Sequence, residues 1–140
     1  MPIVEALWKW LNTCEDKPAE ISIASLAMQG SNAAITLHPM GETTTRQYIS
    51  GSRLVDYKFA VFLRVRAMND QDRAEAFGAA EQLSRWVSLS GGVPDLGEGR
   101  KAYRVRETVA PMLVNRDAAA DDFQTIYTLT YKEDKPNAAI

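Results

Sequence analysis

The strongest constraint on the fold is a strict alternation at residues 57–66, which read YKFAVFLRVR. Apolar or aromatic side chains occupy every second position: Tyr57, Phe59, Val61, Leu63 and Val65. Successive side chains of a β-strand point to opposite faces, so this period of two predicts a strand with one buried face. Phe62 interrupts the polar set between them. We therefore expect the second face to be partly covered, by a helix or by another subunit.

The same alternation recurs near the end of the chain. Residues 102–109 and 123–131 place mostly apolar or aromatic side chains at every second position, with Glu107 and Thr125 as the exceptions, which predicts two further strands. The small polar segment between them, residues 115–122, is interpreted as a loop.

Earlier segments give weaker signals. Residues 33–39 predict a strand that Pro39 ends, followed by a loop at 39–45. Residues 44–49 then predict a strand that stops at the Ser-Gly-Ser break. The run EISIASLAM at 20–28 fits either a short strand or a helical turn.

Two segments have helical spacing. In residues 2–14 apolar side chains recur at spacings of three and four, which predicts an amphipathic helix. Trp10 lies off its main stripe, so it is either a flank of the core or an exposed aromatic that reaches a partner. A second helix is predicted over 71–89 with Asp70 as its N-cap, and the glycines and proline of 90–99 predict a loop.

The order of helix, strands, helix, strands indicates an α+β fold. We expect a mainly antiparallel sheet of four to five strands with both helices packed on one face. The chain has 140 residues, of which 46% are hydrophobic and 24% charged, which is typical of one folded domain. We predict a single domain over 1–133 and a frayed tail over 134–140.

Several function classes have little support. No apolar run is long enough for a membrane span, and the first residues lack a secretory leader, so we expect a cytoplasmic product. Cys14 is the only cysteine and His38 the only histidine. A nucleophile pair of the two is conceivable, but neither lies on a turn that would expose a nucleophile. We expect no enzyme, no metal and no cofactor.

The arginines of the predicted strands are the main candidates for contacts. Arg64 with Arg66, and Arg104 with Arg106, each project from one strand face, and neighbouring strands could gather them into a basic stripe. The stripe would bind nucleic-acid phosphate, pair with acidic residues of an adjacent subunit, or simply be solvated. A net charge of -2 and the lack of interleaved stacking aromatics weaken the nucleic-acid interpretation.

The layout resembles the small minor capsid, or tail terminator, proteins of long-tailed bacteriophages and prophages. The likeness covers about Pro2 to Glu133. It rests on the following segments: HPMG at 38–41, YISGSRLVDYKFAVFLRVRA at 48–67, LSRWVSL at 83–89, VPDL at 93–96 and FQTIYTLTYKE at 123–133. None of these segments is a catalytic signature.

This resemblance implies a subunit of a ring, expected to be a hexamer, that caps the tail tube and joins it to the head connector. It implies no cofactor, no membrane partner and no specific nucleic acid. The protein would reside in the host cytoplasm and then in the virion. A head-completion or other neck protein, or a small nucleic-acid-binding module, remains the alternative.

Individual contact residues are our own inference from the sequence. The candidate subunit interface comprises Arg46, Arg53, Phe62, Arg64, Arg66, Arg104 and Arg106. The candidate loops for contact with the tube or connector contain Met40, Glu42, Asp95, Leu96, Asp117 and Asp121.

Overall fold

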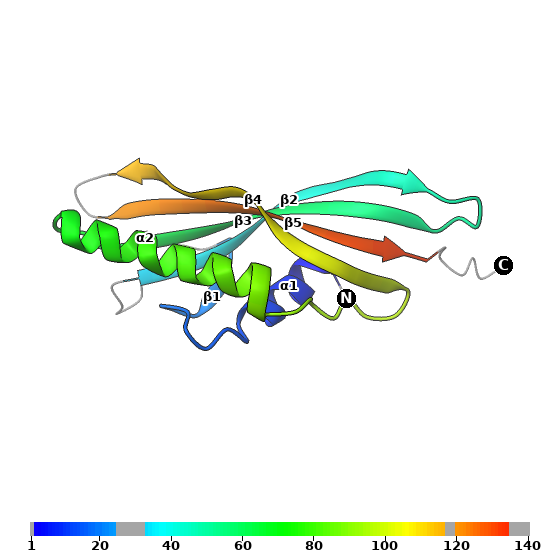
Figure 1. The fold of residues 1–140 in the computed structure, drawn as a ribbon, viewed down its shortest axis with the longest axis horizontal. Coiled ribbons are helices and arrows are strands. Elements are labelled where there is room, and N and C mark those ends of the chain that lie inside the picture. Colours follow the sequence, from blue (N-terminus) through cyan, green and yellow to red (C-terminus); the bar gives the residue numbers. More distant parts are fainter. Residues whose placement is uncertain (1, 25–32, 117–119, 135–140) are drawn as a thin grey trace.

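The computed structural model describes residues 2–24, 33–116 and 120–134. The elements in chain order are α1 (Ile3–Leu11), β1 (Ile21–Ile23), β2 (Ala33–Gln47), β3 (Arg53–Val65), α2 (Asp70–Arg85), a π-helical turn (Trp86–Ser90), β4 (Arg100–Arg116) and β5 (Asp121–Glu133). The strands form one five-stranded sheet in the order β1-β2-β3-β5-β4 (Figure 1). Only β1 and β2 are parallel, so the predicted α+β fold with a mainly antiparallel sheet is confirmed.

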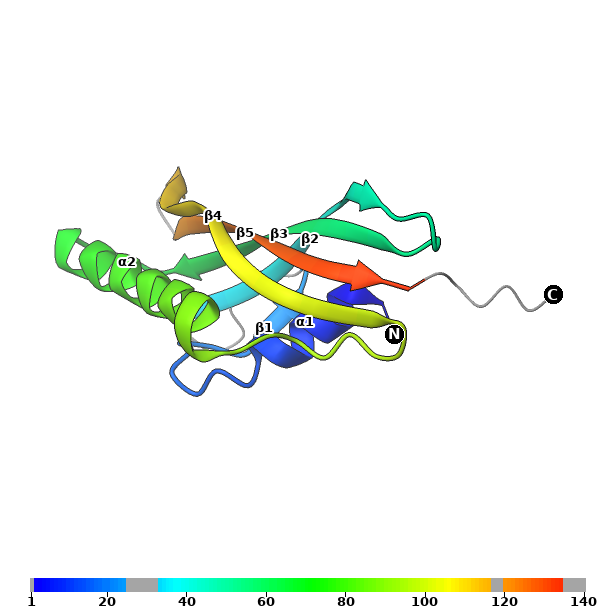
Figure 2. The same ribbon diagram turned by 45° about the vertical axis from the view of Figure 1, so that its right-hand side comes forward.

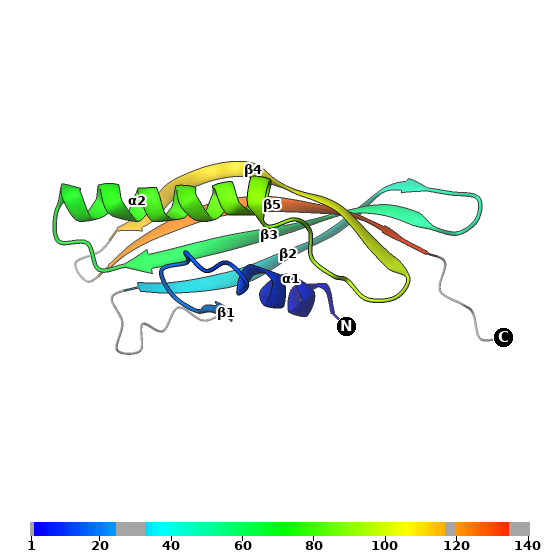
Figure 3. The ribbon, with the colours of Figure 1, turned by 60° about the horizontal axis from the view of Figure 1, so that its bottom comes forward.

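Both helices lie on one face of this sheet, which we call the inner face (Figure 3). A single hydrophobic cluster joins the two layers. From the strands it takes residues such as Ile35, Leu37, Phe59, Val61, Leu63, Phe123, Tyr127 and Leu129, and from the helices Leu7, Leu11, Ala76, Ala80 and Leu83. The alternating apolar residues that the sequence shows on β3 and β5 are therefore the ones that point to the inner face.

The first helix is shorter than predicted because Asn12 leaves it to bind β1. The Asn12 side chain accepts a hydrogen bond from Ile21 N at 2.9 Å and donates one to Ile21 O at 3.1 Å. Trp10 is buried, its Nε1 donates to Gly91 O at 2.8 Å, and its ring centre lies 5.1 Å from that of Trp86. Trp10 is thus a flank of the core.

The second helix begins at Asp70, one residue earlier than predicted. Asn69 is the N-cap, and its Oδ1 accepts a hydrogen bond from Asp72 N at 2.9 Å. Asp70 already belongs to the first turn, where its carboxylate interacts favourably with the positive end of the helix dipole. The α-helix ends at Arg85, and the predicted final residues form the π-helical turn.

The predicted loop at 39–45 is wrong, because β2 runs through it without interruption. Register shifts after Pro39 and after Thr44 absorb the irregular residues as bulges. Proline has no N–H for a ladder, but β1 pairs with β2 only at Ile35–Leu37, so Pro39 already lies on a sheet edge. The β2–β3 hairpin, residues 44–54, forms an arm that projects from the body (Figure 1).

The other edge strand, β4, is also longer than predicted. It continues through Pro111 to Arg116 and bends strongly across the sheet, with several register shifts against β5 (Figure 2). The predicted loop at 115–122 is therefore strand at both ends, while 117–119 lie outside the described residues. Of the predicted tail only Asp134 is described, and its N donates to Gly99 O at 2.7 Å.

The run at 20–28 is a short strand where it is described, since β1 spans Ile21–Ile23, while 25–32 lie outside the described residues. Over 2–24, 33–116 and 120–134, no helix has both the length and the apolar character to cross a membrane.

Candidate assembly surface

The face of the sheet opposite the helices, which we call the outer face, carries no helix of the described chain (Figure 3). Directly paired residues of antiparallel strands point to the same face. The pairing of β2, β3, β5 and β4 therefore orders the outer-face side chains in rows across the sheet. These rows divide the outer face into two halves of different chemistry.

The half farther from the arm is apolar. One row joins His38, Ala60, Ile126 and Val109, and the next contains Phe62, Gln124 and Met112. We call this set the apolar half: His38, Ala60, Phe62, Val109, Met112 and Ile126. Val109 and Met112 are 37% and 46% exposed, so this half presents large apolar groups to the surroundings.

The half nearer the arm is basic. The first row joins Arg46, Leu54, Lys132 and Lys101, the second contains Asp56, Thr130 and Arg104, and the third contains Lys58, Thr128 and Arg106. We call its cationic residues the basic half: Arg46, Lys58, Lys101, Arg104, Arg106 and Lys132. Their convergence concentrates positive charge on a protein whose net charge is slightly negative.

Local partners neutralise only part of this charge. Asp56 accepts a hydrogen bond from Thr130 Oγ1 at 2.7 Å, and its carboxylate lies 3.9 Å from the Arg106 guanidinium. Lys132 Nζ lies over the ring of Tyr48 at 5.5 Å, a cation–π contact. Within the described part of the chain, Arg46, Lys58 and Arg104 are exposed and form no ion pair.

The predicted arginines do not share one stripe. Strand β5 separates β3 from β4, and Arg64 lies beyond the apolar half, where its Nε and Nη2 contact the Asp122 carboxylate at 2.7 and 2.9 Å. Arg66 follows the end of β3. Of that set, only Arg104 and Arg106 belong to the basic half.

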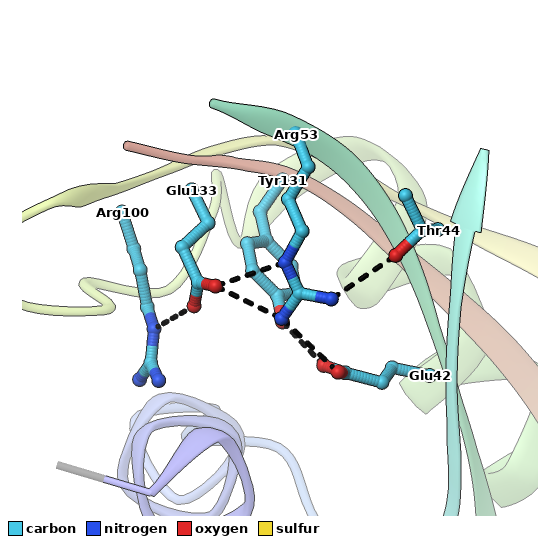
Figure 4. A network of polar contacts seen from close by, with 6 residues as sticks. All are labelled: Glu42, Thr44, Arg53, Arg100, Tyr131 and Glu133. Atoms are coloured by element: carbon cyan, nitrogen blue, oxygen red, sulfur yellow. Dashed lines mark hydrogen bonds and ion pairs between the residues drawn. The ribbon is translucent and has the colours of Figure 1, made fainter. Parts of the chain in front are cut away.

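Among the other interface candidates, Arg46 belongs to the basic half and Phe62 to the apolar half. Arg53 instead lies in a polar network on the inner side of the arm (Figure 4). Its Nε donates to Glu133 at 2.9 Å, Nη2 to Glu42 at 3.1 Å and Nη1 to Thr44 at 3.0 Å. Arg53 therefore ties both strands of the hairpin to the end of β5.

The same network holds Glu133 ionised. Burial opposes its negative charge, but hydrogen bonds from Arg100 and Arg53 outweigh burial and lower the pKa of Glu133. Arg100 Nε donates to this carboxylate at 3.0 Å. Tyr131 Oη donates to Glu42 at 2.9 Å, and burial together with this bond raises the pKa of Tyr131.

The predicted contact loops are only partly available to partners. Met40 is exposed on β2, and Asp95 is exposed in the loop before β4, where it accepts a hydrogen bond from Gly97 N at 3.0 Å. Leu96 is 3% exposed and belongs to the core, so its assignment to a contact loop is wrong. Asp121 is 1% exposed and is likewise no contact residue.

Glu42 lies in the network of Figure 4, on a strand. Asp117 lies outside the described residues.

Sequence reasoning missed most of the outer face. The missed residues are His38, Lys58, Ala60, Lys101, Val109, Met112, Ile126 and Lys132. The alternation at 57–66 could have identified Lys58, because Lys58 and Phe62 are four residues apart and therefore lie on the same strand face. Lys101, Met112 and Lys132 lie beyond the expected strand ends, so only the true strand lengths reveal them.

The described structure keeps the two residues of the conceivable nucleophile pair apart. His38 lies on the outer face with its ring 6.1 Å from Phe62, whereas Cys14 is buried in the core on the inner side. Across the described ranges, no group of three or more histidine, cysteine or acidic residues is placed to hold a metal ion.

No protein-family model matches this chain, and a search of curated proteins finds no match.

Proposed function

We propose that this protein is the tail terminator of a long-tailed bacteriophage or prophage. Copies of the chain would form a ring that caps the finished tail tube and joins it to the head connector. The observation that carries this proposal is the outer face, where exposed apolar and cationic side chains lie together on a surface that no described helix covers.

The composition of the outer face suits a protein contact. Protein interfaces combine an apolar centre with polar and arginine-rich surroundings, and contiguous exposed apolar groups mark contact sites. Phe62 and Met112 flank Gln124 in one row, Ile126 lies in the adjacent row, and the basic half borders this set. A subunit that remained alone would leave this surface in water.

The two edges of the sheet favour assembly through the outer face over assembly by strand addition. An exposed edge strand can add further chains without limit, and proteins prevent this with bulges, prolines and charges. Strand β4 has Pro111, several register shifts and basic side chains, and β2 beyond Leu37 has Pro39 and a bulge. Open-ended strand addition is thus disfavoured, as a closed ring requires.

The basic half is the observation that favours a second candidate, a small nucleic-acid-binding module. Phosphate contacts need cationic side chains, which this half supplies. The adjoining apolar half weighs against it, because Phe62 and Met112 have no favourable contact to make with phosphate.

The test is the solution mass by light scattering over a range of protein concentrations, followed by addition to purified tail tubes that lack the protein. The proposal expects a ring that binds one end of each tube and stops its elongation. DNA affinity that falls steeply with salt, without ring or tube binding, would instead establish the nucleic-acid module.

A further inference from the structure

We propose that the outer face of one subunit binds α2 of a second copy of the chain. The contact is heterologous, with the basic half against the exposed carboxylates of the helix and the apolar half against the apolar residue that follows it. This inference rests on the proposed function and names the surfaces that would form the ring.

The exposed side of α2 is acidic. The helix contains Asp70, Asp72, Glu75 and Glu81, and both glutamates are exposed. Arg73 and the exposed Arg85 offset only part of this charge: Arg73 binds Asp70 through Nη1 at 3.1 Å and the buried Asp121 through Nε at 2.8 Å, and four acidic residues face two arginines. The second copy therefore offers the exposed carboxylates of Glu75 and Glu81 to a cationic surface.

The two charged surfaces lie on opposite sides of one subunit. Helix α2 covers the inner face, while the basic half lies on the outer face, with the sheet between them (Figure 3). The carboxylates of α2 consequently cannot reach the basic half of their own chain. Only a second copy can bring these complementary charges together.

The spacing between charged and apolar groups along the helix also matches their spacing along the outer face. Leu89 follows α2 and is 77% exposed. At helical rise, Glu75 and Leu89 lie about 20 Å apart. On β3, Asp56 in the middle row of the basic half and Phe62 in the apolar half are also about 20 Å apart. A helix lying along the strands can therefore place carboxylates on the basic half and Leu89 on the apolar half.

A contact of this kind is head to tail. Each subunit presents its outer face to one neighbour and α2 to another, so the contact repeats and closes into a ring if the rotation per subunit allows. Nucleic acid would satisfy the cations but leave the apolar half in water. The second copy satisfies both halves.

Paired charge reversals test the contact directly. One variant combines Lys58→Glu with Arg104→Glu, and the other combines Glu75→Lys with Glu81→Lys. Each pair should weaken self-association about tenfold or more in light scattering, because like charges then face one another. All four changes in one chain should restore association, since the attraction is rebuilt with its signs exchanged.

Matched control changes are Glu15→Lys with Glu98→Lys, which alter two exposed acids outside α2 and should leave the solution mass unchanged. Circular dichroism establishes that every variant folds. A helix variant that associates like the wild type, a combined variant that fails to recover, or a wild type that stays monomeric at every concentration would overturn the contact.

Tube binding separates the two proposals. If the helix variant still forms a ring and caps tail tubes, the proposed function stands and this contact is wrong. If the reversals behave as expected but the wild-type ring ignores tail tubes, the contact stands and the tail terminator function is wrong.

Discussion

At the scale of single residues, Gly91 shows how closely the end of the π-helical turn packs. A Cβ at this position would lie 2.9 Å from atoms of the Trp86 ring, whose centre lies 5.1 Å from that of the Trp10 ring. We expect Gly91→Ala to lower the free energy of unfolding by about 1–3 kcal/mol, because the ring must move from a packed position. Denaturant unfolding measures the change.

Gly78 provides the matched control for the same chemical change. It lies inside α2, and nothing lies within 4 Å of the Cβ that alanine would add. Gly78→Ala should therefore stabilise the protein by about 0.5–1 kcal/mol through helix propensity. Equal effects of the two substitutions would contradict the packing explanation for Gly91.

The carboxylate of Glu133 makes stability depend on pH. The pKa of Glu133 in the folded protein lies below the ordinary value of 4.5. The ionised carboxylate therefore contributes its full share of the unfolding free energy above about pH 4.5, and this share is lost as pH falls through the folded pKa. The difference in unfolding free energy between the wild type and Glu133→Gln should therefore shrink from about pH 6 to about pH 3. A difference that stays constant with pH would refute this role.

At the scale of elements, the arm depends on Arg53. The guanidinium joins β2 and β5 through Glu42 and Glu133, so Arg53→Met leaves two carboxylates without their shared cation. We expect faster amide hydrogen exchange in residues 43–47, while exchange in the core strands stays unchanged.

Arg46→Met is the control for the arm, since Arg46 is exposed on the same hairpin and forms no ion pair in the described part of the chain. Its exchange pattern should match that of the wild type. Equal acceleration in both variants would mean that any loss of positive charge loosens the arm.

At the scale of the whole molecule, the apolar half separates folding from assembly. Met112 is 46% exposed, so Met112→Glu should leave thermal unfolding nearly unchanged but weaken self-association about tenfold or more by placing a carboxylate at a contact. Analytical ultracentrifugation beside thermal unfolding measures both effects.

Ile23→Glu is the comparison, because Ile23 is similarly exposed at 41% but belongs to β1, with its side chain on the inner side like that of Ile21. It should leave self-association intact. Loss of assembly in both variants would indicate a general effect of added negative charge.

The periodic segments could be predicted from the sequence, because local side-chain alternation reports burial directly. The strands around Phe59 and Tyr127 and the helix containing Ala80 appear where the pattern predicts them. Pro39 misled the prediction, since it lies on a sheet edge where a missing N–H costs little.

The sequence by itself determined the α+β class, the inward set of β3 and β5, and the presence of cations on strands, since each follows from local periodicity and composition. Tertiary structure alone decided which cations share a surface. Because β5 lies between β3 and β4, Arg64 pairs with Asp122 while Lys58 joins Arg106 across β5. Strand order depends on contacts between residues far apart in the chain, and no local pattern encodes it.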